Sequence, residues 1–183
     1  MPRAGLSPDA VVDAALEVTD ANGPETLTLA AVASHAGVAT PSLYKHISSL
    51  AELRLMVAAR VANQLGDAVT AAVLGLGGAK AVAAFMRAWR RYALDHPPRY
   101  RSIPQSGGDY APWVEASQRS LGVLFPILDA CGVTGVDAVH MVRGIRAAAH
   151  GFVVVQLSEG FQLGADVDES YERLIAAVTA SLP

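Results

Sequence analysis

Residues 27–47 read LTLAAVASHAGVATPSLYKHI, and this stretch decides the fold. Ala33 is a small residue where two helices can cross, Gly37 follows four residues later as a left-handed turn residue, and Leu43 follows after six more as an apolar anchor. This is the spacing of a helix-turn-helix. It predicts a short helix over Ser42–Ile47 that is tethered by its apolar residue and projects its opposite face.

Helix start signals occur inside this stretch and on either side of it. The signals are Ser7-Pro8 before a helix that stops at Asn22-Gly23-Pro24, Thr28 before a helix over 29–36, Thr40-Pro41 before the third helix, and a capping box of Ser49 and Glu52 before a fourth helix. The start of the chain therefore reads as a compact helical module.

The rest of the chain also has helical periodicity, and no strand is predicted. Helices are expected over 79–95, 110–131, 136–158 and 168–182, with Pro97-Pro98 as a break between the first two. The predicted fold class is all-α: an N-terminal three-helix helix-turn-helix domain at 1–50, and a helical bundle at 51–183. A helix at about 50–74 would connect them.

Composition limits the function classes. The chain has 183 residues, of which 52% are hydrophobic, and 14 Lys and Arg stand against 17 Asp and Glu, a net charge of −3. This composition excludes an intrinsically disordered chain, and it gives no global basic field, so nucleic-acid binding must be local. A single cysteine and the lack of a visible export signal or long apolar span predict a cytoplasmic protein without a membrane partner.

Catalytic and metal-binding motifs are missing from the sequence. There is no His-Glu-x-x-His pair, no Gly-x-Ser-x-Gly elbow and no phosphate-cradling Gly-x-x-x-x-Gly-Lys loop. We therefore expect neither an enzyme nor a bound metal or cofactor.

The third predicted helix presents small and polar residues that suit a DNA groove. They are Thr40, Pro41, Ser42, Tyr44, Lys45 and His46. The first residues of a recognition helix meet base edges in the major groove, while hydroxyl groups and free N–H groups at helix starts such as Thr28 and Ser49 suit phosphates. This pattern predicts an interface with double-stranded DNA.

The chain from Ser7 to about Gly66 closely resembles the DNA-binding domain of the tetracycline-repressor (TetR) family of transcription regulators. The resemblance rests on Leu27-Thr28-Leu29, Val32-Ala33, Ala36-Gly37-Val38, the segment Leu43-Tyr44-Lys45-His46-Ile47, and Leu53. It implies an all-helical homodimer in which residues 1–50 form the DNA-binding domain and residues 51–183 the ligand-binding and dimerisation domain. Such a dimer would bind a palindromic operator and leave it when a small molecule enters the C-terminal domain. By the same resemblance, Thr28, Tyr44 and His46 would contact phosphates, and Thr40, Ser42 and Lys45 would lie near the major groove.

One position predicts reduced affinity for DNA. Leu50 stands where the family usually has a lysine, and residues 1–60 carry four basic side chains against six acidic ones. Loss of one phosphate-binding cation flattens the salt dependence of binding by about one unit. We therefore expect modest operator affinity.

The C-terminal part resembles a subgroup of the same family that carries a Trp-His-Gly signature. The corresponding residues here are Ala149-His150-Gly151, so the tryptophan is replaced. A set of mostly aromatic residues on candidate inner faces either lines a ligand pocket or fills the core: Trp89, Tyr92, Trp113, Phe125, Met141 and His150. Five arginines between residues 87 and 101 either bind an anionic effector or solvate a helix end.

The helix expected at 136–158 is apolar on more than one face. One face would cover its own core, and the other, together with the last helix, would form a two-fold four-helix interface in a homodimer. The leading hypothesis is a ligand-released repressor. The alternative is a helical small-molecule-binding protein or enzyme whose helix-turn-helix is a non-functional remnant, a reading motivated by Leu50 and the acidic module.

Overall fold

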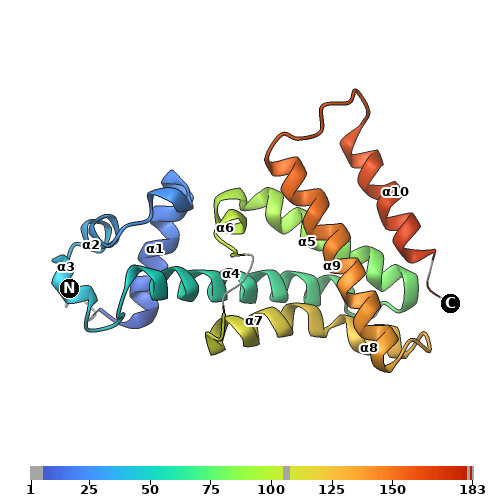
Figure 1. The fold of residues 1–183 in the computed structure, drawn as a ribbon, viewed down its shortest axis with the longest axis horizontal. Coiled ribbons are helices and arrows are strands. Elements are labelled where there is room, and N and C mark those ends of the chain that lie inside the picture. The colour runs from blue at the N-terminus through green and yellow to red at the C-terminus, as the bar shows by residue number, and fades with distance from the viewer. Residues whose placement is uncertain (1–5, 105–107, 181, 183) are drawn as a thin grey trace. The chain divides into compact units, whose positions relative to one another are not determined.

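The computed structural model describes residues 6–104, 108–180 and 182, and every regular element within them is a helix (Figure 1). The elements are α1 (Pro8–Asn22), the 3₁₀ turn η1 (Pro24–Thr26), α2 (Leu29–Ala36), α3 (Thr40–Leu43), α4 (Leu50–Val73), α5 (Gly78–Asp95), α6 (Pro97–Arg101), α7 (Ala111–Gly122), α8 (Leu124–Asp129), α9 (Gly135–Leu157) and α10 (Val167–Thr179). The all-α prediction is confirmed.

The chain forms two compact units. The N-terminal unit contains residues 1–62 and 96–116, and the C-terminal unit contains residues 63–95 and 117–183. Both α4 and α7 therefore contribute residues to each unit. The functional division at residue 50 stays a prediction, because compactness alone does not assign function.

The predicted start signals of α1, α2 and α4 form hydrogen bonds in the structure. The hydroxyl of Ser7 accepts from the Ala10 N–H at 3.1 Å, that of Thr28 from the Ala31 N–H at 3.1 Å, and that of Ser49 from the Glu52 N–H at 3.1 Å. Gly37 ends α2 in the left-handed region with φ 66°. The predicted bonds to Ser7, Thr28 and Ser49 and the left-handed Gly37 are therefore confirmed, but the Glu52 half of the capping box differs, since its carboxylate accepts from Ser48.

The bounds predicted for the third helix are wrong. α3 covers Thr40–Leu43, and the extended residue in front of it is Ala39, whose carbonyl accepts from the Ser42 N–H at 2.8 Å. Residues 44–46 form a turn instead of continuing the helix. The Thr-Pro pair did not identify the first helical residue because a proline fits anywhere in the first turn, where N–H groups have no helical partner.

Proline also explains two differences in the second half. The helix predicted over 110–131 is split into α7 and α8, because Pro126 has no N–H to donate to Gly122, four residues earlier, and its ring crowds that carbonyl. Pro97-Pro98, predicted as a break, begins the short helix α6 instead, since both prolines occupy its first two positions.

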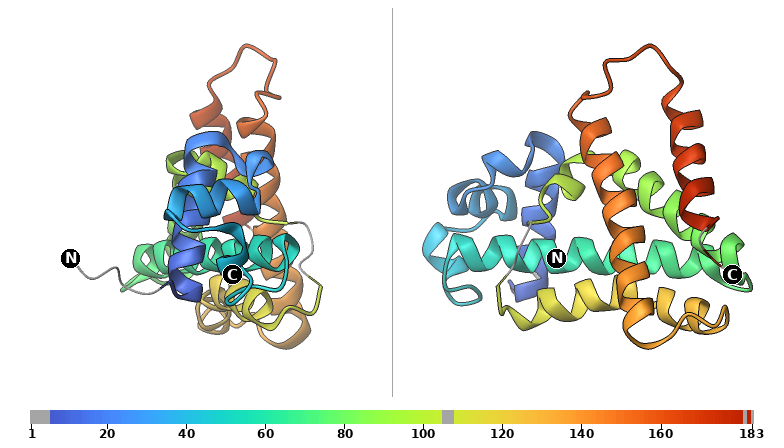
Figure 2. Two further views of the ribbon diagram at one scale, coloured as in Figure 1. Left: turned by 90° about the vertical axis from the view of Figure 1, so that its left-hand side faces the viewer. Right: turned by 45° about the vertical axis from the view of Figure 1, so that its right-hand side comes forward.

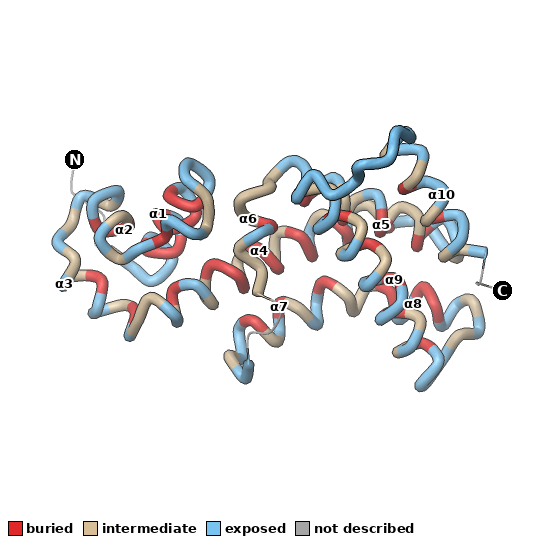
Figure 3. The backbone as a smooth tube through the Cα atoms, turned by 45° about the horizontal axis from the view of Figure 1, so that its top comes forward, coloured by how far each residue is buried: buried red, intermediate tan, exposed pale blue. Residues whose placement is uncertain are grey.

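Each of the two units has buried side chains of its own. In the N-terminal unit α1 packs on α2, and α2 on α3, around Val11, Val32 and Leu43. In the C-terminal unit α5 packs on α8, α9 and α10 (Figures 2 and 3). The side chains of Phe85 and Tyr171 are fully buried in this unit. No helix among the described residues is long and apolar enough to cross a membrane.

Candidate nucleic-acid interface

Two buried anchors position the exposed residues that follow α3. Leu43 is 0% exposed and Ile47 is 3% exposed, and both backbone N–H groups at the end of this turn, those of His46 and Ile47, donate to the Leu43 carbonyl at 2.8 and 3.1 Å. The residues between the anchors face outward: Tyr44 is 57% exposed and Lys45 is exposed. The turn after α3 thus holds a phenol and an ammonium group in solvent.

The other predicted DNA-binding residues lie in the same unit. Pro41 is exposed, Thr40 and Ser42 are half-buried in α3, and His46 is half-buried after it. Thr28 and Ser49 are the N-cap residues of α2 and α4, and their hydroxyl oxygens accept backbone N–H groups. Each hydroxyl still has its proton to donate, which suits a phosphate oxygen.

Sequence reasoning missed the role of Ser48. The Glu52 carboxylate accepts from the backbone N–H of Ser48 at 2.5 Å and from its hydroxyl at 2.6 Å, and these bonds lower the pKa of Glu52. In the expected capping box this carboxylate would instead return to the N–H of Ser49. The Ser48-Ser49 pair in the sequence was the available signal, because either serine can end the loop.

The acidic residues of α1 have basic partners. Arg60 bonds to Asp9 and Asp13 at 2.7 Å each, Arg99 bonds to Asp20 at 2.5 Å, and His35 bonds to Glu17 at 2.5 Å. Lys45, by contrast, makes no ion pair with any residue that the structure describes. Its charge is therefore available to a phosphate or a base.

The residues predicted for a ligand pocket do not all share one unit. Trp113 lies in the N-terminal unit, where it packs with Ala58, Ala59, Ala62 and Ala116. The other five lie in the C-terminal unit, where Trp89 and Tyr92 are buried, Met141 and His150 are half-buried, and Phe125 is 40% exposed. The tyrosine hydroxyl of Tyr92 donates to Gln64 Oε1 at 2.9 Å.

His150 is the residue of this set whose pKa is shifted. Burial lowers its pKa from the usual 6.5, and the positive charge of Arg146 lowers it further. The neutral imidazole is therefore favoured near pH 7, and it can both donate and accept a hydrogen bond. Within the described residues, no group of three or more His, Cys, Asp or Glu side chains could hold a metal ion.

Two family models match the chain in the order of its two halves. A model of bacterial regulatory proteins of the tetR family matches residues 11–56, and a model of the tetracyclin repressor-like C-terminal domain matches residues 82–178, just over half of the chain. The first match contains the helix-turn-helix described above.

Full-length relatives agree with these matches. The chain is 30% identical over 169 residues to the HTH-type transcriptional regulator YobS of Bacillus subtilis, covering 92% of this chain and 88% of that protein. It is 29% identical over 181 residues to the HTH-type transcriptional regulator Rv0681 of Mycobacterium tuberculosis, covering 98% of this chain and 83% of that protein.

Solved structures share the fold at lower identity. A protein of unknown function from Rhodococcus sp. RHA1 has a TM-score of 0.82 at 22% identity, covering 100% of this chain and 98% of that one. A TetR variant from Acinetobacter baumannii in complex with minocycline has a TM-score of 0.75 at 19% identity, covering 96% of this chain and 95% of that one. At these identities the likeness concerns the fold.

Proposed function

The chain belongs to the tetR family of bacterial regulatory proteins, and from this premise we propose that it is a dimeric repressor that leaves a palindromic operator when a small molecule binds. As a member it is a DNA-binding transcriptional regulator of the helix-turn-helix type. Family members bind DNA and small molecules and form dimers. The operator symmetry, the residues and the effector site are our proposals.

The observation that carries the proposal is the exposure of Tyr44 and Lys45 between the buried anchors Leu43 and Ile47. Such an arrangement places polar side chains outside the fold without loosening the core. We assign base contacts to Lys45 and to the start of α3, Thr40, Pro41 and Ser42. We assign phosphate contacts to Tyr44 and His46 and to the N-cap hydroxyls of Thr28 and Ser49.

The exposed face of α9 supports a dimer. Val136 is 67% exposed, Val154 45% and Val155 39%, although the helix buries Val142 and Ile145 on its other face. Apolar side chains exposed along one helix gain free energy when a second copy covers them. A two-fold axis through this face and α10 would then present two copies of α3 to successive major grooves about 34–36 Å apart.

The effector is proposed to act through the C-terminal unit. Trp89, Tyr92, Met141 and His150 belong to this unit and combine apolar surface with polar tips. A ligand releases DNA only if it binds the DNA-incompetent conformation more tightly than the DNA-competent one. We expect no catalysis, so the ligand would leave unchanged.

Selection of duplexes from a random library with the purified protein tests the proposal. The expected result is a palindrome with two half-sites, and Tyr44→Ala with Lys45→Ala should weaken binding to it by more than tenfold. Lys80→Ala, at an exposed position of α5 in the C-terminal unit, is the matched control and should bind as the unchanged protein does.

The remnant hypothesis predicts the opposite outcome. A folded, dimeric protein that enriches no sequence at low or moderate salt would be a helical ligand-binding protein with an inactive helix-turn-helix. If the same sequence is enriched equally well after the Tyr44 and Lys45 substitutions, the protein is still a DNA-binding regulator, but our assignment of these residues to the DNA interface is wrong.

A further inference from the structure

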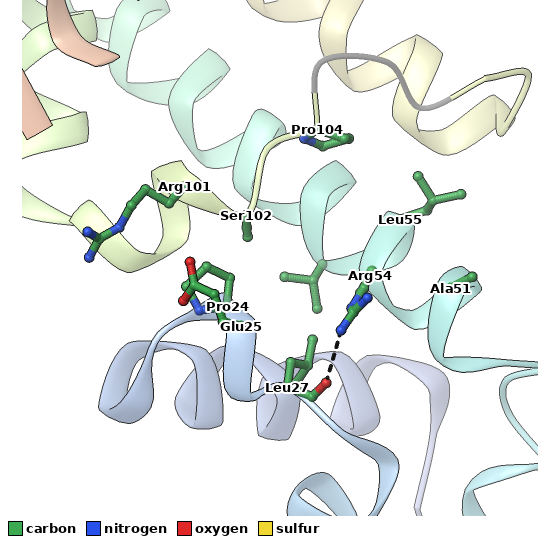
Figure 4. A pocket seen from close by; sticks show the side chains of 10 residues that line it. Pro24, Glu25, Leu27, Ala51, Arg54, Leu55, Arg101, Ser102 and Pro104 are labelled. Atoms are coloured by element: carbon green, nitrogen blue, oxygen red, sulfur yellow. Dashed lines mark hydrogen bonds between the residues drawn. The ribbon is translucent and has the colours of Figure 1, made fainter. Parts of the chain in front are cut away.

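The walls of two surface hollows differ in their chemistry. The hollow of the N-terminal unit, about 550 Å³, carries two guanidinium groups that diverge: Arg54 donates to the carbonyl of Leu27 at 3.4 Å, and the side chain of Arg101 points away from Arg54 (Figure 4). Its charges therefore do not converge on one ligand. The hollow of the C-terminal unit, about 440 Å³, lies where α8 is followed by α9 and is mostly apolar.

The hollow at the start of α9 has an apolar wall with one charged group. Phe125 and Pro126 of α8, Val133 before α9 and Ala138 within α9 supply the apolar surface, and Asp129 supplies the charge. Phe125, which also belongs to the set predicted for an effector, is exposed. An alkyl side chain that covers such a surface gains free energy. The hollow therefore suits an aliphatic side chain of a protein partner.

At the other end of α9, the connection to α10 presents an apolar side chain to solvent (Figure 1). Leu163 is 88% exposed, the highest fraction of any large apolar residue that the structure describes. Its loop is nevertheless fixed by contacts on either side. Phe161 packs on Phe152 with the ring centroids 4.6 Å apart, and Gln162 Nε2 donates to the Glu159 carbonyl at 2.6 Å. The loop thus holds Leu163 outward without covering it.

The exposed face of α9 between these two ends has a spacing that reads the same in both directions. Successive members are 4, 4, 3, 4 and 4 residues apart, and all of them are exposed: Val136, His140, Gly144, Ala147, Gly151 and Val155. An antiparallel copy of α9 laid on this face meets the same members in reverse order. Val136 then lies against Val155 of the second copy, and Gly144 against Ala147 of the second copy.

The glycines of this face leave room for a second helix. A Cβ added at Gly144 or Gly151 would meet nothing within 4 Å, so packing inside the chain does not require a glycine at either position. The distance between two packed helices depends on the side chains at their contact, and small residues allow the shortest distances. The middle of α9 is therefore suited to close approach by a second α9, with a valine near each end.

We propose that Leu163 of each copy docks into the hollow at the start of α9 of the other copy, at the two ends of an antiparallel α9 pair. A two-fold axis between residues 145 and 146 maps the end of α9 onto its start, so the loop after α9 faces the α8–α9 corner of the second copy. This inference rests on the dimer of the proposed function, and it adds the pairing register and the segment that docks.

Cysteine cross-linking of the full-length protein tests the register. All variants carry Cys131→Ala, which removes the single native thiol. Val136→Cys combined with Val155→Cys should give a covalent dimer with bismaleimidohexane, because the two positions meet between subunits. Each single substitution is the control, since its two thiols would lie about 28 Å apart along the helix axis at about 1.5 Å per residue. No cross-linking of the double variant, or cross-linking of a single variant, would overturn the register.

The docked side chain is tested by dimer affinity in sedimentation equilibrium. Leu163→Asp should weaken dimerisation at least about tenfold, because it places an unpaired charge in an apolar hollow. Leu163→Met keeps an apolar side chain of similar volume and should dimerise as the unchanged protein does. Leu74→Asp, at an exposed leucine after α4 in the same unit, is the matched control and should also leave dimerisation unchanged. Unchanged dimer affinity in Leu163→Asp, or equal weakening in Leu74→Asp, would overturn the docking.

The unchanged protein separates this inference from the proposed function. If it sediments as a monomer and selects no palindrome, both the proposed function and the docking are wrong. If it is a dimer that selects a palindrome, but Leu163→Asp dimerises equally well, the proposed function stands and the docking of Leu163 is wrong.

Discussion

Leu43 and Tyr44 are adjacent residues with opposite environments, and replacing each by alanine separates stability from DNA binding. Leu43 is fully buried and is the last residue of α3, a helix of four residues without a side-chain cap. A helix this short has no stability of its own and depends on its tertiary contacts. Leu43→Ala removes the buried anchor, and deletion of a buried leucine side chain costs about 3 kcal/mol.

The magnitude can be compared with the whole protein. Domains have unfolding free energies of about 5–15 kcal/mol, so this loss is a large share of the total. In a chain of this size, 1 kcal/mol corresponds to about 2–4 °C in the melting temperature, which gives an expected drop of about 6–12 °C. Tyr44→Ala, at a side chain that is 57% exposed, should change the unfolding free energy by no more than about 0.5 kcal/mol.

Urea denaturation followed by circular dichroism measures the free energy of unfolding of both variants. All samples need the same protein concentration, because the unfolding of a dimer depends on concentration. Fluorescence anisotropy with the selected operator measures DNA binding at a temperature where both remain folded. The reasoning is refuted if Leu43→Ala loses less than about 1 kcal/mol, or if Tyr44→Ala is equally destabilised, since the anchor and the projecting face would then not be distinct.

Three further predictions concern single side chains. Leu50→Lys should steepen the slope of log affinity against log salt by about 0.9 per subunit, measured by operator titrations at several salt concentrations; an unchanged slope would mean that the start of α4 does not meet a phosphate. Arg90→Lys should fail to restore the stability lost in Arg90→Ala, because the guanidinium lies 5.0 Å from the centroid of the Tyr171 ring and 5.9 Å from that of the Phe152 ring. Equal melting temperatures for the unchanged protein and Arg90→Lys would contradict this prediction. The pKa of His150 is lowered on folding, so below pH 6.5 the unfolded chain binds more protons than the folded protein, and stability falls on acidification. His150→Gln should flatten that part of the pH profile of the unfolding free energy, and an unaltered profile would contradict this prediction.

Local signals predicted the helices well where one residue type determines the backbone. Thr28 and Gly37 bound α2 because a hydroxyl cap and a left-handed glycine act within their own turn. Prolines were harder to interpret, since the same residue begins a helix at Pro97 and interrupts one at Pro126. The difference depends on which residues come before the proline in the helix, and the hydrophobic pattern does not give this.

The candidate sites also differ in how far the sequence could predict them. The exposed residues after α3 could be predicted because they directly follow the apolar anchor Leu43 inside one short segment. The ion pair of Arg99 with Asp20 could not, because the two residues are 79 positions apart in the sequence and meet only when α6 joins the N-terminal unit. The sequence offers one interpretation for the whole arginine-rich segment 87–101. In the structure Arg87, Arg90, Arg91 and Arg99 are ion-paired, whereas Arg101 has no carboxylate partner among the described residues.

The acidic balance of the first 60 residues, one of the two reasons to consider an inactive helix-turn-helix, loses much of its weight in the structure. Four of the six acidic side chains lie on α1 and are bonded to Arg60, His35 and Arg99. Arg99 comes from α6, so a count limited to the first 60 residues leaves out a cation that packs within the same unit. Paired charges contribute little field at a distance, whereas Lys45, which has no such partner in the described ranges, contributes its full charge to the surface after α3. The remaining reason is Leu50, and the slope measured for Leu50→Lys decides whether it weakens an active DNA reader.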